Sequence, residues 1–221
     1  ETPASDPGRV VSIADKIDAI VGAFSIGIQP TGSQDPYALR RQAQGIVAIL
    51  LESGWNLSLK ELCQESYSLF EKQGTALLPR EDILSSLQDF FRQRVRFVLQ
   101  EQGLRYDTVD AVLAYGCDDV NRVVKMARVL GEKRGEEAFI LYAQTYTRCF
   151  NLTKKEALAE LDSSRLVDQT EVALAQSVAL RRESFEKLMV AGNYEEAYDL
   201  AWELVPQIEA LFQAVMIMVE D

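Results

Sequence analysis

The sequence predicts an all-α protein, a helical bundle-like fold of about nine to ten helices. Apolar residues recur at intervals of three and four along most of the 221 residues, which is typical of amphipathic helices. No segment shows the sustained apolar–polar alternation of a β-strand. Capping residues, glycines and prolines divide the chain into helix-length pieces. With 48% hydrophobic and 26% charged residues, the composition is that of a globular chain that can bury a core.

The first helix is expected to follow a loop formed by residues 1–9, which contains two prolines. The helix should run from Val10 to Ser25, because apolar residues repeat along one side of it. These residues are Val10, Ile13, Ala14, Ile17, Ile20, Val21 and Phe24.

The stretch from Gly27 to Ala43 reads as a rigid turn that feeds a second helix. Pro30 fixes φ and Gly32 permits a positive φ, and together they end the first helix. Asp35 is a good N-cap and Pro36 suits the first helical position. We therefore expect Arg40 and Arg41 in the second turn, about 100° apart around the helix axis.

The next elements are separated by clear signals. Gly54 should end the second helix in the usual C′ position. The Ser58–Glu61 sequence is a capping box, and it predicts a third helix that continues to about Gln73. Residues 74–79 form a connector, and a long helix is expected over residues 80–102.

The second half of the chain is divided into helices by the same kinds of capping and helix-ending residues. Asp107 should cap a short helix that ends near Gly116, and Asp118 or Asp119 should begin the next one. The other expected helices are residues 136–151, a short one after the Thr153–Glu156 capping box, residues 167–191, one capped by Asn193, and one that begins near Pro206.

The absent residues and motifs exclude several kinds of catalysis. The sequence contains no histidine, which removes Ser–His and Cys–His pairs, His-ligated zinc and an imidazole base. No phosphate-binding glycine-rich motif is present. Cys63, Cys117 and Cys149 are far apart and fit free thiols in a reducing compartment. No apolar run is long enough to span a membrane, and nothing resembles a signal peptide.

Charge is distributed unevenly along the chain. The net charge is −11, which opposes binding to nucleic acid. Residues 156–221 carry 4 basic and 14 acidic side chains, whereas residues 118–155 carry 8 basic and 5 acidic ones. Aromatic residues lie between basic ones in that middle stretch, a combination that suits RNA through phosphate neutralisation and base stacking.

Several motifs resemble the β subunit of the heterotetrameric bacterial glycyl-tRNA synthetase. They are Ala14-Asp15-Lys16-Ile17-Asp18, the Pro30–Arg41 stretch PTGSQDPYALRR, Leu104-Arg105-Tyr106-Asp107 with Asp110–Ala114, and the final Val215–Asp221 segment. The family continues beyond both ends of this sequence, so we interpret the chain as an internal to C-terminal fragment. The resemblance implies that residues 1–73 are the C-terminal part of an HD-like helical domain. Residues 74–221 would then be a helical region similar to an anticodon-binding domain, truncated at its C-terminus.

The resemblance also implies a function. The whole enzyme is a cytoplasmic glycine–tRNA ligase that uses ATP and Mg to attach glycine to tRNA(Gly), as a heterotetramer with an α subunit. In that family the α subunit carries the aminoacylation site, and the β subunit supplies tRNA binding and scaffolding. We therefore expect no catalytic residue, no cofactor and no membrane contact in this fragment. The candidate tRNA-binding residues are Arg40, Arg41, Arg92, Arg96, Arg122, Lys125 and Arg148.

Two details qualify these candidates. Arg92 and Arg96 are four residues apart and so share one helix face, with Arg94 roughly opposite. Planar guanidinium groups suit phosphate oxygens, but a solvated face is the plain alternative. Around Arg148 the family has a "K-R-x-x-N-I" motif, and Thr147 replaces its lysine here.

Two other functions stay open at this point. In HD-type phosphohydrolases an Asp at the position of Asp15 supplies a metal ligand, but the chain lacks the histidines of such a site. We therefore expect no metal site, with Asp15 as a vestigial ligand position. The other alternative is a non-enzymatic helical adaptor whose acidic C-terminal part meets a basic protein.

Overall fold

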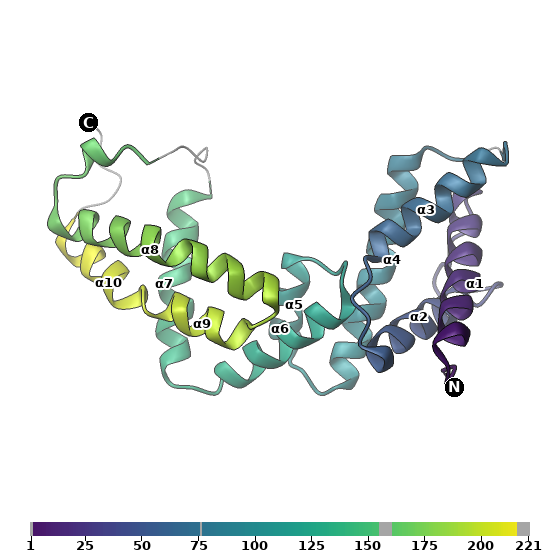
Figure 1. Cartoon of the computed structure of the whole chain (residues 1–221), viewed down its shortest axis with the longest axis horizontal. Helices are drawn as coiled ribbons and strands as arrows, with labels where there is room; N and C mark the ends of the chain where they lie inside the picture. Colours follow the sequence, from purple (N-terminus) through teal and green to yellow (C-terminus); the bar gives the residue numbers. More distant parts are fainter. Residues whose placement is uncertain (1, 76, 155–160, 216–221) are drawn as a thin grey trace. The chain divides into compact units, whose positions relative to one another are not determined.

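A computed structural model describes residues 2–75, 77–154 and 161–215. Over this part of the chain the only β-type pairing is an isolated bridge between Thr31 and Gln34, and the predicted all-α fold is confirmed (Figure 1). The chain divides into two compact units, residues 1–128 and 129–221. The helices are α1 (Asp6–Ser25), α2 (Leu39–Ser53), α3 (Leu59–Lys72), α4 (Arg80–Glu101), α5 (Tyr106–Tyr115), α6 (Val120–Lys133), α7 (Ala138–Thr153), α8 (Gln169–Ala191), α9 (Tyr194–Trp202) and α10 (Val205–Ala214), with a 3-10 turn at Ser163–Arg165.

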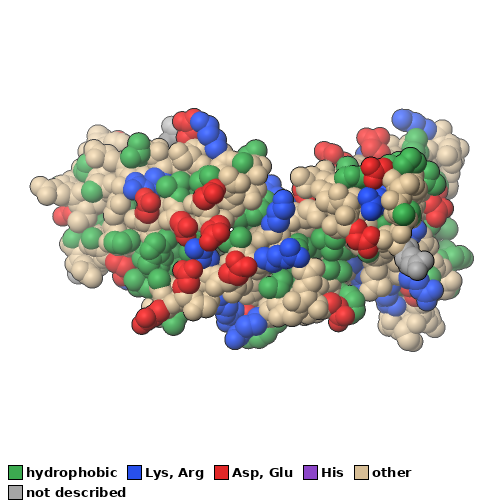
Figure 2. Space-filling view, turned by 60° about the horizontal axis from the view of Figure 1, so that its bottom comes forward, with side chains coloured by type: hydrophobic (Ala, Val, Ile, Leu, Met, Phe, Trp, Pro, Cys, Tyr) green, Lys and Arg blue, Asp and Glu red, His purple; other side chains and the backbone are tan. Residues whose placement is uncertain are grey.

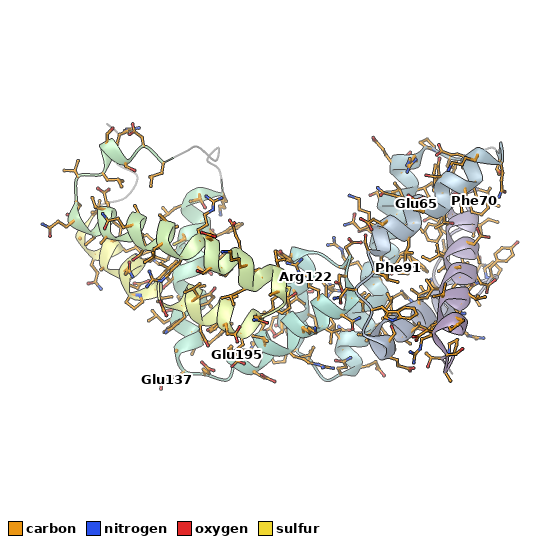
Figure 3. The ribbon with its side chains drawn as sticks, viewed as in Figure 1. Glu65, Phe70, Phe91, Arg122, Glu137 and Glu195 are labelled. Carbon is orange, nitrogen blue, oxygen red and sulfur yellow. The ribbon has the colours of Figure 1, made fainter. Side chains whose placement is uncertain are left out.

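The first unit has a well-formed hydrophobic core. Helix α1 packs against α2 and α3, and α4 packs against α1, α2, α3 and α5. The ring of Phe90 lies 5.1 Å from that of Phe24 and 5.9 Å from that of Phe91, which is labelled in Figure 3. Helix α4 is therefore the central helix of this unit, and the side chains on its sides are held by several neighbours.

The first helix begins four residues earlier than predicted. Ser5 is the N-cap, and its hydroxyl accepts a hydrogen bond from the backbone N–H of Gly8. Asp6 lies in the first turn, where a negative charge is favourable, and Pro7 occupies a position that needs no N–H donor. Pro7, one of the two prolines that suggested a loop, lies in the first turn of the helix, and Pro3 precedes the N-cap.

The predicted start of the second helix was wrong. Helix α2 begins at Leu39, because Ala38 adopts a left-handed backbone conformation with φ of 52° that interrupts any helix running back to Pro36. Asp35 still serves the helix, since its carboxylate accepts the N–H groups of Leu39 (2.8 Å) and Arg40 (3.1 Å). Arg40 and its neighbour Arg41 accordingly lie in the first turn of α2.

Asp118, in the loop between α5 and α6, caps α3 from a distance of some sixty residues along the chain. Its carboxylate accepts the Ser58 hydroxyl at 3.0 Å and the backbone N–H of Lys60 at 2.7 Å. Its carbonyl accepts the N–H of Leu59 at 3.0 Å. Ser58 also caps α3 by accepting the N–H of Glu61, as predicted.

Asn121, at the start of α6, makes a second link of this kind. Its amide nitrogen donates to the carbonyl of Leu50 at 2.8 Å and to that of Trp55 at 2.9 Å. Leu50 lies in the last turn of α2, and its carbonyl also accepts the N–H of the C-cap residue Gly54 at 3.0 Å, so Asn121 adds a second donor there. Asp118 and Asn121 together fasten the junction between α5 and α6 to the junction between α2 and α3.

The second unit is built around α8, which packs along α9 and α10, while α7 packs against α10 (Figure 1). An aromatic cluster of Phe139, Tyr142, Tyr198 and Trp202 joins α7 to α9, with ring centroids 4.8–6.5 Å apart.

Lys133 lies beside this cluster. Its ammonium group contacts Asp199 at 3.0 Å and both Glu136 and Glu195 at 3.4 Å, and it lies over the ring of Tyr198. Glu195 is labelled on α9 in Figure 3. The hydrogen bond to Asp199, aided by the charges of Asp199 and Glu136, raises the pKa of Lys133 above its ordinary value.

The helices of the second unit can be compared with the caps and helix boundaries that the sequence predicts. Asp168 and Glu171 form a full capping box, and α8 begins at Gln169, two residues after its predicted start. Asn193 precedes α9 without a side-chain hydrogen bond. Thr153 ends α7 and its hydroxyl donates to the carbonyl of Cys149, while the rest of the predicted Thr153–Glu156 capping box and the start of its helix lie outside the described residues.

The compact units do not coincide with the predicted domains. The unit that contains α1–α3 also contains α4, α5 and most of α6. The division into domains at residues 1–73 and 74–221 follows from the family resemblance and stays a prediction.

Candidate nucleic-acid interface

The predicted tRNA-binding residues come from four helices. Six lie in the first unit, on α2, α4 and α6, and Arg148 lies on α7 in the second unit. The face shown in Figure 2 carries basic side chains interspersed with acidic ones. The neighbours of each arginine therefore decide whether its charge is available to a ligand.

Arg40 lies close to Arg94, which reaches toward α2 from α4. Burial lowers the pKa of Arg94, the charge of Arg40 lowers it further, and the charge of Asp35 opposes both effects. The guanidinium of Arg94 lies 5.5 Å above the ring of Phe90, and its Nε is buried without a hydrogen-bond partner among the described residues. The charge of Asp35 offsets these effects only in part, and its carboxylate also accepts the backbone N–H groups of Leu39 and Arg40.

Arg92 and Arg122 both reach the segment from Tyr115 to Cys117. Burial raises the pKa of Cys117, and the positive charge of Arg92 partly offsets that effect. Arg122, labelled in Figure 3, donates to the Tyr115 hydroxyl at 2.9 Å and lies 5.3 Å from the centre of its ring. The Tyr115 ring is 61% exposed, so Arg122 contacts an aromatic side chain that solvent can reach.

Arg96 differs from its neighbours on α4 because it forms an ion pair with Asp110 of α5. Lys125, on the second turn of α6, is exposed. Arg128, one turn further along, donates to the side-chain carbonyl of Gln102 at 3.4 Å. Of this group, the charge of Arg96 is the one already balanced by a carboxylate.

Arg148 does not join the other candidates. Its guanidinium pairs with Glu209 at 3.0 Å and lies 3.8 Å from the ring centre of Phe212, both on α10. These contacts hold Arg148 between α7 and α10. Its arrangement is that of a residue that supports packing within the second unit.

Sequence reasoning left Arg94 out of the candidates and noted only that it lies roughly opposite Arg92 and Arg96 on the helix. The available signal was the spacing of four between Phe90 and Arg94, which places a guanidinium over an aromatic ring on the same helix face.

An apolar pocket of about 560 Å³ lies between α3, α4 and residues 115–118. Two thiols line it, together with leucine side chains and Phe91. Burial raises the pKa of Cys63 to about 12 and also raises that of Cys117. Because the thiolate is the reactive form of cysteine, these groups are poor nucleophiles.

Asp15 lies exposed on α1. In the part of the chain that the structure describes, no group of three or more His, Cys, Asp or Glu side chains could hold a metal ion. The helices over the same residues include none long and apolar enough to cross a membrane.

Comparison with known proteins assigns the chain to a family. A family model described as glycyl-tRNA synthetase beta subunit matches residues 1–114, just over half of the chain. The glycine–tRNA ligase beta subunit of Desulfitobacterium hafniense (strain DSM 10664 / DCB-2) is 60% identical over 221 residues, which are 100% of this chain and 32% of that relative. The corresponding subunit of Syntrophomonas wolfei is 40% identical over 219 residues, 99% of this chain and 32% of the relative. That of Clostridioides difficile is 33% identical over 219 residues, 99% of this chain and 31% of the relative.

The chain thus spans about a third of the length of the curated relatives it matches. The motifs of the first helix and of the Pro30–Arg41 turn lie inside the region that the family model covers. The chain belongs to the glycyl-tRNA synthetase beta subunit family.

Proposed function

We propose that the chain is part of the β subunit of a glycine–tRNA ligase and contributes tRNA binding and scaffolding to the ATP-dependent glycylation of tRNA(Gly). The partners are an α subunit, in a heterotetramer, and tRNA, and the compartment is the cytoplasm. ATP and Mg belong to the whole enzyme, and this chain supplies no catalytic residue. Family membership supports this proposal, because the relatives carry the name glycine–tRNA ligase beta subunit.

The pair formed by Arg94 and Arg40 carries the part of the proposal that concerns tRNA. Burial and the charge of Arg40 both lower the pKa of Arg94, and a buried Nε without a partner among the described residues costs free energy. A phosphate group at Arg94 would offset the charge of Arg40 and accept this spare hydrogen bond. Arg41, Arg122 and Lys125 extend the basic surface, whereas Arg96 and Arg148 already have carboxylate partners.

A salt-dependent titration of the chain with tRNA(Gly), with a non-cognate tRNA for comparison, tests this function. We expect binding that weakens as salt rises, because phosphate contacts release counterions. Arg94→Met should reduce the salt slope by about 1 and weaken binding to all sequences evenly. The same substitution should leave the midpoint of thermal unfolding unchanged or raise it, because it removes a repulsion within the protein.

Arg182→Met is the matched control, since Arg182 is an exposed arginine of α8 that pairs only with Glu186 in the next turn. It removes the same charge and should leave the tRNA affinity unchanged. Equal weakening by both substitutions would show that net charge, and not the Arg94 site, governs binding. An absence of tRNA binding even at low salt would reduce the role of the chain to scaffolding.

A further inference from the structure

The second unit buries few side chains for its size. Its buried side chains among the described residues are those of Lys133, Thr145, Tyr194, Ala197 and Val205. Helix α8 is 23 residues long and contributes no buried residue, and Thr145 is the buried residue of α7. On the face shown in Figure 2, hydrophobic side chains reach the surface at several places over this unit. The unit therefore has apolar surface that the described residues leave uncovered.

The outer face of α7 is a concentrated part of that surface. Ile140 and Tyr146 are each 62% exposed, and Phe150 is 52% exposed. The rings of Tyr146 and Phe150 are stacked, with centroids 6.2 Å apart and planes 18° apart. At 100° per residue, these side chains and Ala143 fall within about 120° of the helix circumference. They form one stripe that is about 15 Å long, at 1.5 Å per residue.

A shallow groove of about 790 Å³ lies beside one end of this stripe, at Ile140 and Ala143. Phe139 also lines it, together with the polar side chains of Arg134, Gln144, Thr147 and Arg148. Helix α7 carries no Asp or Glu, although the unit as a whole is acidic. An apolar stripe of three turns beside a groove is the shape that accepts the apolar face of another helix.

The occupant could in principle be RNA, since stacked aromatic rings accept bases. RNA binding also needs cations, and Arg148, the basic residue of α7, is already paired with Glu209. Ile140 and Ala143 are aliphatic and offer a base neither a stacking surface nor a hydrogen bond. The face therefore favours protein, and the curated relatives are about three times as long as this chain, which leaves ample polypeptide to cover it.

We propose that the outer face of α7 is a docking surface for an amphipathic helix of the same subunit, formed by polypeptide outside these 221 residues. The helix places apolar side chains, spaced by three and four residues, over Ile140, Ala143, Tyr146 and Phe150. Its docking completes the core of the second unit. This inference is independent of tRNA binding.

Thiol labelling tests the proposal. Tyr146→Cys is made in a Cys149→Ala background, both in the chain and in a chimera in which the 221 residues replace the matching segment of the Desulfitobacterium hafniense subunit. Maleimide should label a cysteine at position 146 rapidly in the chain. In the chimera the labelling rate should be lower by a factor of about ten or more, because burial blocks access to the thiol. Glu183→Cys is the matched control, since Glu183 is 78% exposed on α8, and its labelling rate should be the same in both proteins.

Hydrogen exchange on the unsubstituted chain and on a chimera without cysteine substitutions gives a second reading that needs no new cysteine. The backbone amides of α7 should exchange more slowly in the chimera. Equal labelling and equal exchange in the two proteins would overturn the proposal. Protection that appears only after addition of tRNA, or only after addition of the α subunit, would also overturn it and would identify the occupant as RNA or as the partner protein.

Discussion

Two glycines of the first unit show how one missing Cβ can decide the approach of two helices. Both lie inside helices, where alanine is favoured over glycine by about 1 kcal/mol. A Cβ on Gly22 of α1 would lie 2.9 Å from Cζ of Phe70, the ring that α3 places against it (Figure 3). A Cβ on Gly45 of α2 would meet the end of the flexible Lys16 side chain at 3.0 Å. The first contact is with a rigid ring, whereas the second can move aside.

The two substitutions should therefore act in opposite directions. Gly22→Ala should lower the free energy of unfolding by about 1 kcal/mol, because overpacking outweighs the gain in helix propensity. Gly45→Ala should raise it by about 0.5–1 kcal/mol. Urea unfolding followed by circular dichroism measures both, and stabilisation by Gly22→Ala would show that the Phe70 ring gives way.

At the scale of the helices, the start of α6 makes hydrogen bonds that no local sequence pattern predicts. Asn121 satisfies a carbonyl at the end of α2 and another in the loop that follows, although it looks like an ordinary residue of a first helical turn. Asp119, the residue that the sequence offered as a cap, accepts the N–H of Arg122 as expected. Helix α6 is thus capped locally by Asp119 and anchored to α2 by Asn121.

Asn121→Ala should lower the free energy of unfolding by about 1–3 kcal/mol, because it removes two hydrogen bonds and leaves the Trp55 carbonyl without this donor, while the Leu50 carbonyl keeps the Gly54 N–H. Asn193→Ala is the matched control, since Asn193 also begins a helix but makes no capping hydrogen bond with its side chain. That change should stay within about 0.5 kcal/mol. Equal losses from the two variants, measured by denaturant unfolding, would mean that the bonds of Asn121 are not the source of its effect.

For the molecule as a whole, the sequence predicted what depends on local signals. The all-α class, the N-cap at Ser58 and the ends of α2 and α4 follow from short-range spacing of apolar, capping and glycine residues. The start of α2 failed because the left-handed conformation of Ala38 is set by the surrounding turn and not by the residue type.

The candidate interface was predictable only in part, for a related reason. Charge and spacing identify arginines, but they do not say which carboxylates lie beside them. Arg96 and Arg148 are paired through Asp110 and Glu209, which lie 14 and 61 residues away in sequence. Arg94 came close to Arg40 because α4 packs on α2, which only the three-dimensional fold reveals. Aromatic residues of α7 divide in the same way: Tyr142 packs inward, whereas Tyr146 stays exposed.

The links made by Asp118 and Asn121 also bear on synthesis at the ribosome, where the chain emerges from its N-terminus. The ends of α2 and α3 that these residues satisfy are made some sixty residues earlier. The N–H groups of Leu59 and Lys60 and the carbonyl of Trp55 therefore lack these partners until residues 118–121 have left the ribosomal exit tunnel. Released chains that stop at residue 116 should be digested by a protease far faster than chains that stop at residue 128. Equal resistance of the two chains would mean that the helices pack without these links. The expected difference would mean that the nascent first unit becomes resistant to proteolysis once the start of α6 has been made.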